Sequence, residues 1–110
     1  MKLPNAGRAV VDLRKLRDYC LNQVHPRGQH KARLFKGALG LTAQDVLELQ
    51  QLLHSAARSE DAVALAADDY GQRYALDFLV KRSSGQATIR SLWIIRRGED
   101  FPRLVTCYIL

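Results

Sequence analysis

Apolar residues in the first half of the chain recur every three to four positions, the spacing of an amphipathic α-helix. Three helices are predicted: residues 12–22, with Asp12 as N-cap; residues 29–39, with Gly40 as C-cap; and residues 42–58, which open with a capping sequence. Their apolar faces are Leu13, Leu16 and Cys20; Leu34, Phe35, Ala38 and Leu39; and Val46, Leu49, Leu53 and Ala56.

After residue 61 the apolar period changes to two, which is typical of β-strands. Strands are predicted at 62–68, 72–82, 87–97 and 103–110, joined by short turns that contain Gly, Ser and Asp. Short turns make consecutive strands antiparallel neighbours, so the strands form a meander. N-terminal helices (about three) followed by a four-stranded antiparallel meander predict an α+β fold, in a single domain of residues 1–110.

Alternation along the strands predicts which side chains face the helices. In the last strand Val105, Cys107 and Ile109 form the inward, apolar face. The outward face of the sheet collects Arg73, Asp77, Arg90, Thr106 and Tyr108. Arg90 is the sharpest of these signals, because a guanidinium in mid-strand needs a partner. Either an ion pair with Asp77 or a bound anion satisfies it, and the sequence leaves both open.

Composition narrows the class of protein. The chain has 47% hydrophobic and 25% charged residues, which is ordinary for a globular domain. It lacks an apolar run of the roughly 18 residues that a membrane helix needs, and it shows no secretory signal. We therefore expect a cytoplasmic protein without membrane contact, in which Cys20 and Cys107 are reduced, buried side chains.

The distribution of charge points to an anionic partner. The net charge is +6. Residues 1–40 hold nine Lys and Arg against two Asp, residues 41–71 hold one Arg against six acids, and residues 72–110 hold seven Lys and Arg against three acids. If the two basic ends meet in space, they form a cationic surface suited to a polyanion.

A basic segment at residues 25–33 (the basic turn) leads into the second predicted helix and includes its first turn. A helix N-terminus presents free N–H groups, and added cations make it a candidate site for an anion. Its charged side chains are His25, Arg27, His30, Lys31 and Arg33. Lys31 lies on the same helix side as Phe35, so its ammonium points inward. A solvated surface turn is the alternative interpretation.

The candidate residue types suit phosphodiester chemistry without a metal. No metal-ligand spacing, glycine-rich nucleotide loop, nucleophile elbow or carboxylate pair is present, and we expect no cofactor. In RNA the 2′-OH attacks the adjacent phosphate when a base takes its proton and cations stabilise the phosphoryl charge. His25 is the candidate proton carrier, Lys31 and Arg90 would hold the phosphate, and Thr106 and Tyr108 would hydrogen-bond or stack. Substrate-binding candidates are Arg27, His30, Arg33 and Arg73.

Several short motifs resemble a small bacterial domain family of uncharacterised function. They are Leu3-Pro-Asn-Ala, Arg8-Ala-Val, Tyr19-Cys-Leu-Asn22, His25-Pro-x-Gly28-x-x-Lys31-Ala32, Tyr70-Gly71 and Pro102-Arg-Leu-Val-Thr106-Cys-Tyr108. That family is similar to the barnase–EndoU–colicin–RelE-like superfamily of ribonuclease toxins. The resemblance implies metal-independent RNA cleavage, and a small acidic antitoxin protein as partner. The chain departs from the barnase-like pattern because no Glu accompanies His25.

Two interpretations therefore remain. The first is an endoribonuclease, expected to be the toxin of a toxin–antitoxin pair. The second is a non-catalytic basic module that binds nucleic acid or an acidic protein. The enzyme requires Lys31, which points toward the helix–sheet interface, and Arg90, on the outward face of the sheet, to meet in one pocket. That needs residues 22–30 to wrap around the sheet edge, or the assignment of the faces to be inverted.

Overall fold

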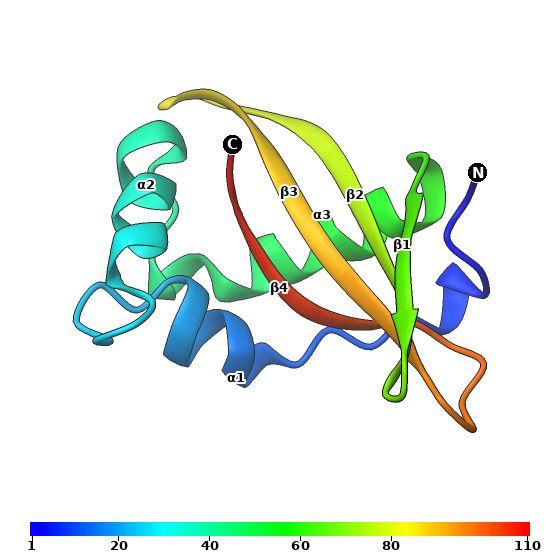
Figure 1. Cartoon of the computed structure of the whole chain (residues 1–110). Helices are drawn as coiled ribbons and strands as arrows, with labels where there is room; N and C mark the ends of the chain where they lie inside the picture. Colours follow the sequence, from blue (N-terminus) through cyan, green and yellow to red (C-terminus); the bar gives the residue numbers. More distant parts are fainter.

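The helices and the sheet form two layers, with α3 behind the sheet and α1 and α2 beyond its β4 edge (Figure 1). The computed structural model describes residues 1–110. Its elements are η1 (Ala6–Arg8), α1 (Leu13–Lys15), η2 (Leu16–Cys20), α2 (Gln29–Leu39), η3 (Ala43–Asp45), α3 (Val46–Ser59), β1 (Val63–Asp68), β2 (Gly71–Arg82), β3 (Gly85–Arg96) and β4 (Arg103–Ile109). The sheet order β1-β2-β3-β4, antiparallel throughout, confirms the predicted α+β meander.

The first helix differs from its prediction in winding. Asp12 caps it as expected, because its carboxylate accepts the backbone N–H of Arg14 at 2.9 Å. After α1 the chain widens into the π-helical turn η2, where the Leu21 N–H donates to the Leu16 carbonyl at 2.8 Å. Residues five apart then share a face, so Leu16 and Leu21 are both buried. Apolar spacing located this helix but did not reveal its wider turn.

The second and third helices follow the sequence closely. α2 spans the predicted residues and ends at Gly40, which adopts the left-handed φ of 68°. Leu34 was predicted on the apolar face, and this is wrong: its side chain is 53% exposed, whereas Ala32 is buried with Phe35. The predicted capping box, in which Thr42 and Asp45 exchange hydrogen bonds, precedes α3. None of the helices combines the length and apolar character that crossing a membrane requires.

The core lies between the helices and the inward face of the sheet. Trp93 is its largest fully buried side chain, as its inward position in β3 predicts. The indole Nε1–H of Trp93 donates to the Ser91 hydroxyl at 2.9 Å, and that hydroxyl donates to the Leu76 carbonyl at 2.7 Å. The polar groups inside the sheet are therefore satisfied without water.

Strand β4 departs from strict alternation. A register shift opposite Leu92 and Trp93 inserts an extra residue into β4. As a result Leu104 and Cys107 are buried, and the prediction that Val105 faces inward with Cys107 is wrong, because Val105 occupies the bulge and is half-buried. The bulge aims the following residues, so that Thr106 lies beside Leu92 and Tyr108 beside Arg90 on the outward face.

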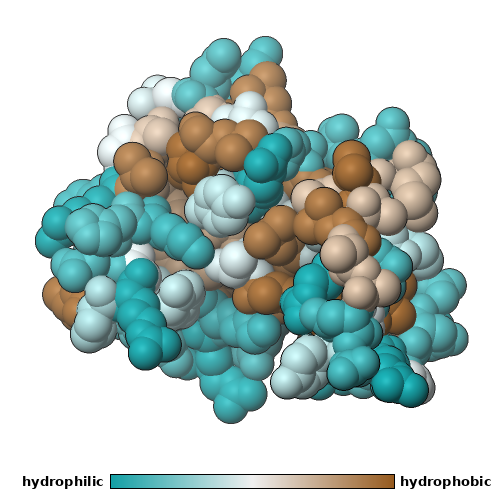
Figure 2. All heavy atoms as spheres, in the orientation of Figure 1, coloured by the Kyte–Doolittle hydropathy of each residue, from teal (hydrophilic) through white to brown (hydrophobic).

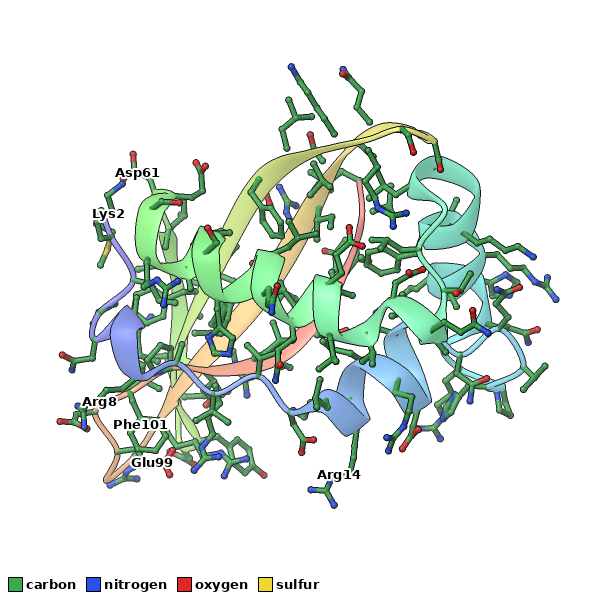
Figure 3. All side chains as sticks on the ribbon, turned by 180° about the vertical axis from the view of Figure 1, so that it is seen from behind. Lys2, Arg8, Arg14, Asp61, Glu99 and Phe101 are labelled. Atoms are coloured by element: carbon green, nitrogen blue, oxygen red, sulfur yellow. The ribbon has the colours of Figure 1, made fainter.

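Ion pairs join the N-terminal segment to the residues just before β1 and to the turn between β3 and β4. Figure 3 shows Lys2 beside Asp61, and their charged groups lie 3.4 Å apart. Arg8 pairs with Asp100 at 2.8 Å, and its guanidinium lies 5.9 Å from the centroid of the Phe101 ring. These contacts hold residues 1–11 along the side of the molecule where α1 begins.

The buried hydroxyl of Ser91 gives a stability prediction. Ser91→Ala leaves the Trp93 Nε1–H buried without an acceptor, so we expect the free energy of unfolding to fall by about 1–3 kcal/mol. Urea unfolding followed by Trp93 fluorescence measures it. The matched control is Ser83→Ala in the exposed β2–β3 turn, which should change the free energy by less than about 0.5 kcal/mol. Equal effects of the two changes would contradict the role given to Ser91.

Candidate active site

Arg90 lies at the centre of the outward face of the sheet, in register with Asp77 on β2 and Tyr108 on β4. Its guanidinium donates from Nε and Nη2 to the two carboxylate oxygens of Asp77, at 2.8 and 2.9 Å. This is the ion pair that the sequence offered as one explanation of Arg90. The hydrogen bonds to Asp77 and its negative charge raise the pKa of Arg90, and the neighbouring Tyr108 adds to the effect. The pair stays open to solvent, because 39% of the Arg90 side chain is exposed.

Lys31 reaches this face from the first turn of α2. Its Nζ lies 5.1 Å from the centroid of the Tyr108 ring and 5.8 Å from that of Tyr19. The ammonium therefore sits between two aromatic faces, one from η2 and one from β4, which attract it electrostatically. Tyr108 in turn lies against Arg90. The helical half wraps around the β4 edge, so two cations from distant parts of the chain flank one tyrosine.

The basic turn is fixed against η2 by His25 and Gly28. The His25 Nδ1 accepts the backbone N–H groups of Arg27 and Gly28 at 3.0 and 3.1 Å. Its ring packs edge-on against Tyr19, with centroids 4.8 Å apart. A Cβ at residue 28 would lie 2.4 Å from the Tyr19 carbonyl oxygen, so only glycine allows this approach. With Nδ1 occupied as an acceptor, the imidazole carries its proton on Nε2.

A cavity of about 450 Å³ opens beside Lys31, between η2 and the bulge of β4. Lys31 and Thr106 line it together with Lys15, Tyr19, Cys20 and Val105. The Lys15 Nζ donates to the Leu104 carbonyl at 3.0 Å and makes no ion pair, so its charge remains available. This cavity has the size and the charge to accept a phosphate with part of its nucleotide.

Both cysteines are free and buried, as the sequence predicted. The Cys20 Sγ lies 3.8 Å from the Thr106 hydroxyl, at the floor of the cavity. A hydrogen bond shared with Cys107 lowers the pKa of the Cys20 thiol to about 6 and raises that of Cys107. The pair joins the end of η2 to β4, the two elements that supply Tyr19 and Thr106 to the lining of the cavity.

The predicted residues fall into two groups. Lys31, Arg90, Thr106 and Tyr108 converge around the cavity and the Arg90 pair, and His25 is linked to them through Tyr19. Among the predicted substrate-binding residues, Arg27, His30 and Arg33 are exposed and line no cavity, and Arg73 pairs with Asp68 at 3.2 Å near the far end of the sheet. The basic turn therefore contributes to the site chiefly through Lys31.

Sequence reasoning missed Lys15 and Tyr19 as site residues. The two are four positions apart, which places them on one face of a helical turn. The sequence shows this spacing, but no neighbouring residue indicates that this face of the helix packs against β4 and is not exposed to solvent. Tyr19 matters most, because its ring contacts both His25 and Lys31.

Comparisons with known proteins agree with this architecture. A family model described as a domain of unknown function, DUF6883, matches residues 2–110. A chain of the contact-dependent growth inhibition toxin–immunity protein complex from Klebsiella pneumoniae 342 has the same fold, with a TM-score of 0.67 over 92% of this chain and 99% of that chain. The two chains are 19% identical, so the likeness shows the fold alone. No curated protein matches the sequence.

The Arg90–Asp77 pair predicts a pH dependence of stability. Arg90 lowers the pKa of Asp77 in the folded protein, so the pair stabilises the fold above about pH 4, the ordinary value for Asp, and this contribution is lost as the pH falls through the lowered pKa. Asp77→Asn should lower the free energy of unfolding at pH 7 by less than about 1 kcal/mol, because the pair is exposed. The difference should shrink as the pH falls below about 4 and the Asp77 carboxylate becomes protonated.

Urea unfolding of both proteins at pH 7 and at low pH measures this difference. Asp69→Asn is the control, since the Asp69 carboxylate is exposed and makes no ion pair. A deficit of Asp77→Asn that persists in acid would mean that packing, and not charge, stabilises the pair.

Proposed function

Because the chain belongs to the DUF6883 family, a domain family of unknown function, its activity has to be argued from its own residues; we propose that it is a metal-independent endoribonuclease that acts as a toxin domain. The proposal rests on one observation: the side chains of Lys31 and Arg90 both lie beside Tyr108. The Lys31 ammonium lies 5.1 Å from the ring of Tyr108, and the Arg90 guanidinium lies beside the Tyr108 hydroxyl. One phosphate placed over Tyr108 would contact both.

The proposed reaction is attack of the 2′-oxygen of a ribose on the adjacent phosphorus. The 2′-O–P bond forms and the P–O5′ bond breaks, so the products are a 2′,3′-cyclic phosphate and a 5′-hydroxyl. The 2′-OH loses its proton and the leaving oxygen gains one. Lys31 and Arg90 would stabilise the charge that develops on the phosphoryl oxygens, where preorganised cations have their largest effect on rate. Thr106 would donate a hydrogen bond from the cavity wall.

His25 remains the proposed proton carrier, and the structure adds a condition to that role. Its Nδ1 lone pair is occupied by two backbone N–H groups, so in this conformation Nε2 is the ring nitrogen left to donate a hydrogen bond. Accepting a proton at Nδ1 requires the turn to release both hydrogen bonds. In the closed turn His25 would donate a hydrogen bond to the phosphate, and charge stabilisation would be the main contribution of the protein to the rate.

The charge of the chain favours the toxin over its inhibitor. The complex from Klebsiella pneumoniae 342 contains a toxin and an immunity protein. A domain that binds phosphates needs an excess of Lys and Arg, whereas a protein that covers such a surface needs the opposite charge. This chain has a net charge of +6 and carries unpaired Lys15 and Lys31 at its cavity. We therefore propose that its partner is a small acidic inhibitor, an antitoxin or immunity protein.

Cleavage of a labelled RNA in EDTA tests the proposal. We expect the wild-type protein to cut it and to leave a 2′,3′-cyclic phosphate, and RNA with 2′-deoxyribose at the scissile position to resist. Lys31→Gln and Arg90→Gln should each reduce kcat/KM by about 100-fold or more, because each removes a cation from the developing charge. His25→Ala should reduce kcat by about 100- to 10,000-fold, because it removes the proposed proton carrier.

Two matched controls separate chemistry from charge. Lys36→Gln near the end of α2 and Arg58→Gln near the end of α3 remove the same charges from exposed positions that line no cavity. They should leave cleavage within about twofold of the wild type. Binding of RNA without cleavage, or cleavage that survives both Lys31→Gln and Arg90→Gln in folded protein, would overturn the enzyme and favour a basic binding module.

A further inference from the structure

A second groove continues from the cavity along the outward face of the sheet. It has a volume of about 480 Å³ and shares Lys15 and Val105 with the cavity. Its remaining lining residues are Asp69, Tyr70, Arg73, Ile94, Arg96 and Arg97. Arg90 and Arg96 are six positions apart on β3, so the two ends of this path are separated by about 20 Å along the strand. A ligand that fills both must be long.

The groove is cationic, and most of its cations are free. Lys15, Arg96 and Arg97 make no ion pair, whereas Arg73 is paired with Asp68. The acidic side chain in the lining is Asp69. Figure 2 shows hydrophilic side chains at the lower margin of this face, over the turns that follow β1 and β3. Three unpaired cations that line one groove are suited to binding phosphates of one strand.

Tyr70 gives this groove an exposed aromatic platform. Its side chain is 74% exposed. Its backbone is nevertheless fixed, because its N–H donates to the Asp68 carboxylate at 2.9 Å and its carbonyl accepts the N–H of Arg97 at 3.1 Å. The next residue, Gly71, has a φ of 146°, and a Cβ there would lie 2.1 Å from the Ile95 carbonyl oxygen. The turn therefore fixes the backbone from which Tyr70 projects and leaves its ring exposed, outside the core.

We propose that this groove binds the single-stranded RNA that flanks the scissile phosphate, with a base stacked on Tyr70 and backbone phosphates on Lys15, Arg96 and Arg97. This inference rests on the proposed function, since the groove shares Lys15 and Val105 with the cavity beside the proposed site of cleavage. A cationic track combined with an exposed aromatic ring is how proteins bind single strands without reading a sequence. An acidic protein would need the charges but would have no need of a ring presented at the end of the track.

Binding is tested with a fluorescent 12-nucleotide RNA in which every ribose is 2′-O-methylated, so that 2′-oxygen attack cannot cleave it. Tyr70→Ala should weaken binding by about 5- to 100-fold, and Tyr70→Phe should restore it, because the ring and not the hydroxyl stacks. Arg96→Gln and Arg97→Gln should each reduce the slope of log K against log salt by about 0.7. Arg58→Gln is the control and should leave that slope unchanged.

Two further probes identify what the groove recognises. An abasic 12-mer should bind the wild type as weakly as the RNA binds Tyr70→Ala; equal binding of abasic and base-containing strands would overturn the stacking. Polyglutamate should compete poorly; competition equal to that of RNA would overturn the RNA site in favour of an acidic protein.

The result is separable from that of the cleavage test. Tight, Tyr70-dependent binding by a protein that cuts no RNA would disprove the nuclease and retain the groove. Cleavage in which Tyr70→Ala affects a 12-mer and a dinucleotide equally would retain the nuclease and disprove the groove. The expected result is a loss of kcat/KM for the 12-mer alone, since a dinucleotide is too short to reach from Tyr108 to Tyr70.

Discussion

The contact on which the site depends is the Lys31 ammonium held between Tyr19 and Tyr108. It joins the helical half of the chain to the outward face of the sheet across the β4 edge. Each partner is placed by an irregularity: the π-helical turn η2 presents Tyr19, Gly28 lets the basic turn approach the Tyr19 carbonyl, and the bulge in β4 aims Tyr108. Regular elements alone would leave the basic turn and Arg90 on separate surfaces.

The Arg90–Asp77 pair is compatible with anion binding because of its geometry and exposure. Asp77 occupies Nε and Nη2 of the guanidinium, which leaves Nη1 directed away from the carboxylate. Both side chains are more than a third exposed, and exposed pairs contribute little net energy. Asp77 therefore orients the guanidinium while a bound phosphate can still compete for it. A buried pair in the same register would have held Arg90 too firmly for that exchange.

The sequence predicted those features that depend on local periodicity. It placed α2 at its observed residues, the capping box before α3 and the four strands of the meander. It predicted that Lys31 points toward the helix–sheet interface, whereas its ammonium lies against Tyr108 on the outward face. It failed where packing overrides periodicity. Leu34 is exposed because α2 turns Ala32 toward the core, and Val105 left the inward face because β4 bulges. Lys31 and Arg90 both lie beside Tyr108 because of the tertiary fold, and the spacing of residues along the sequence cannot predict such a contact.

The charge asymmetry of the sequence has a structural explanation in the pairing of its acids. Carboxylates from the acidic middle of the chain bind cations from both ends: Asp61 pairs with Lys2, Glu48 with Arg82 and Asp68 with Arg73. These pairs fasten the N-terminal segment and both ends of β2, and they neutralise the cations that they hold. The cations left without a carboxylate include Lys31 at the cavity and Lys15, Arg96 and Arg97 along the groove. Lys15, Arg96 and Arg97 thus leave positive charge without a carboxylate along the groove of the outward face, where it can attract a polyanion.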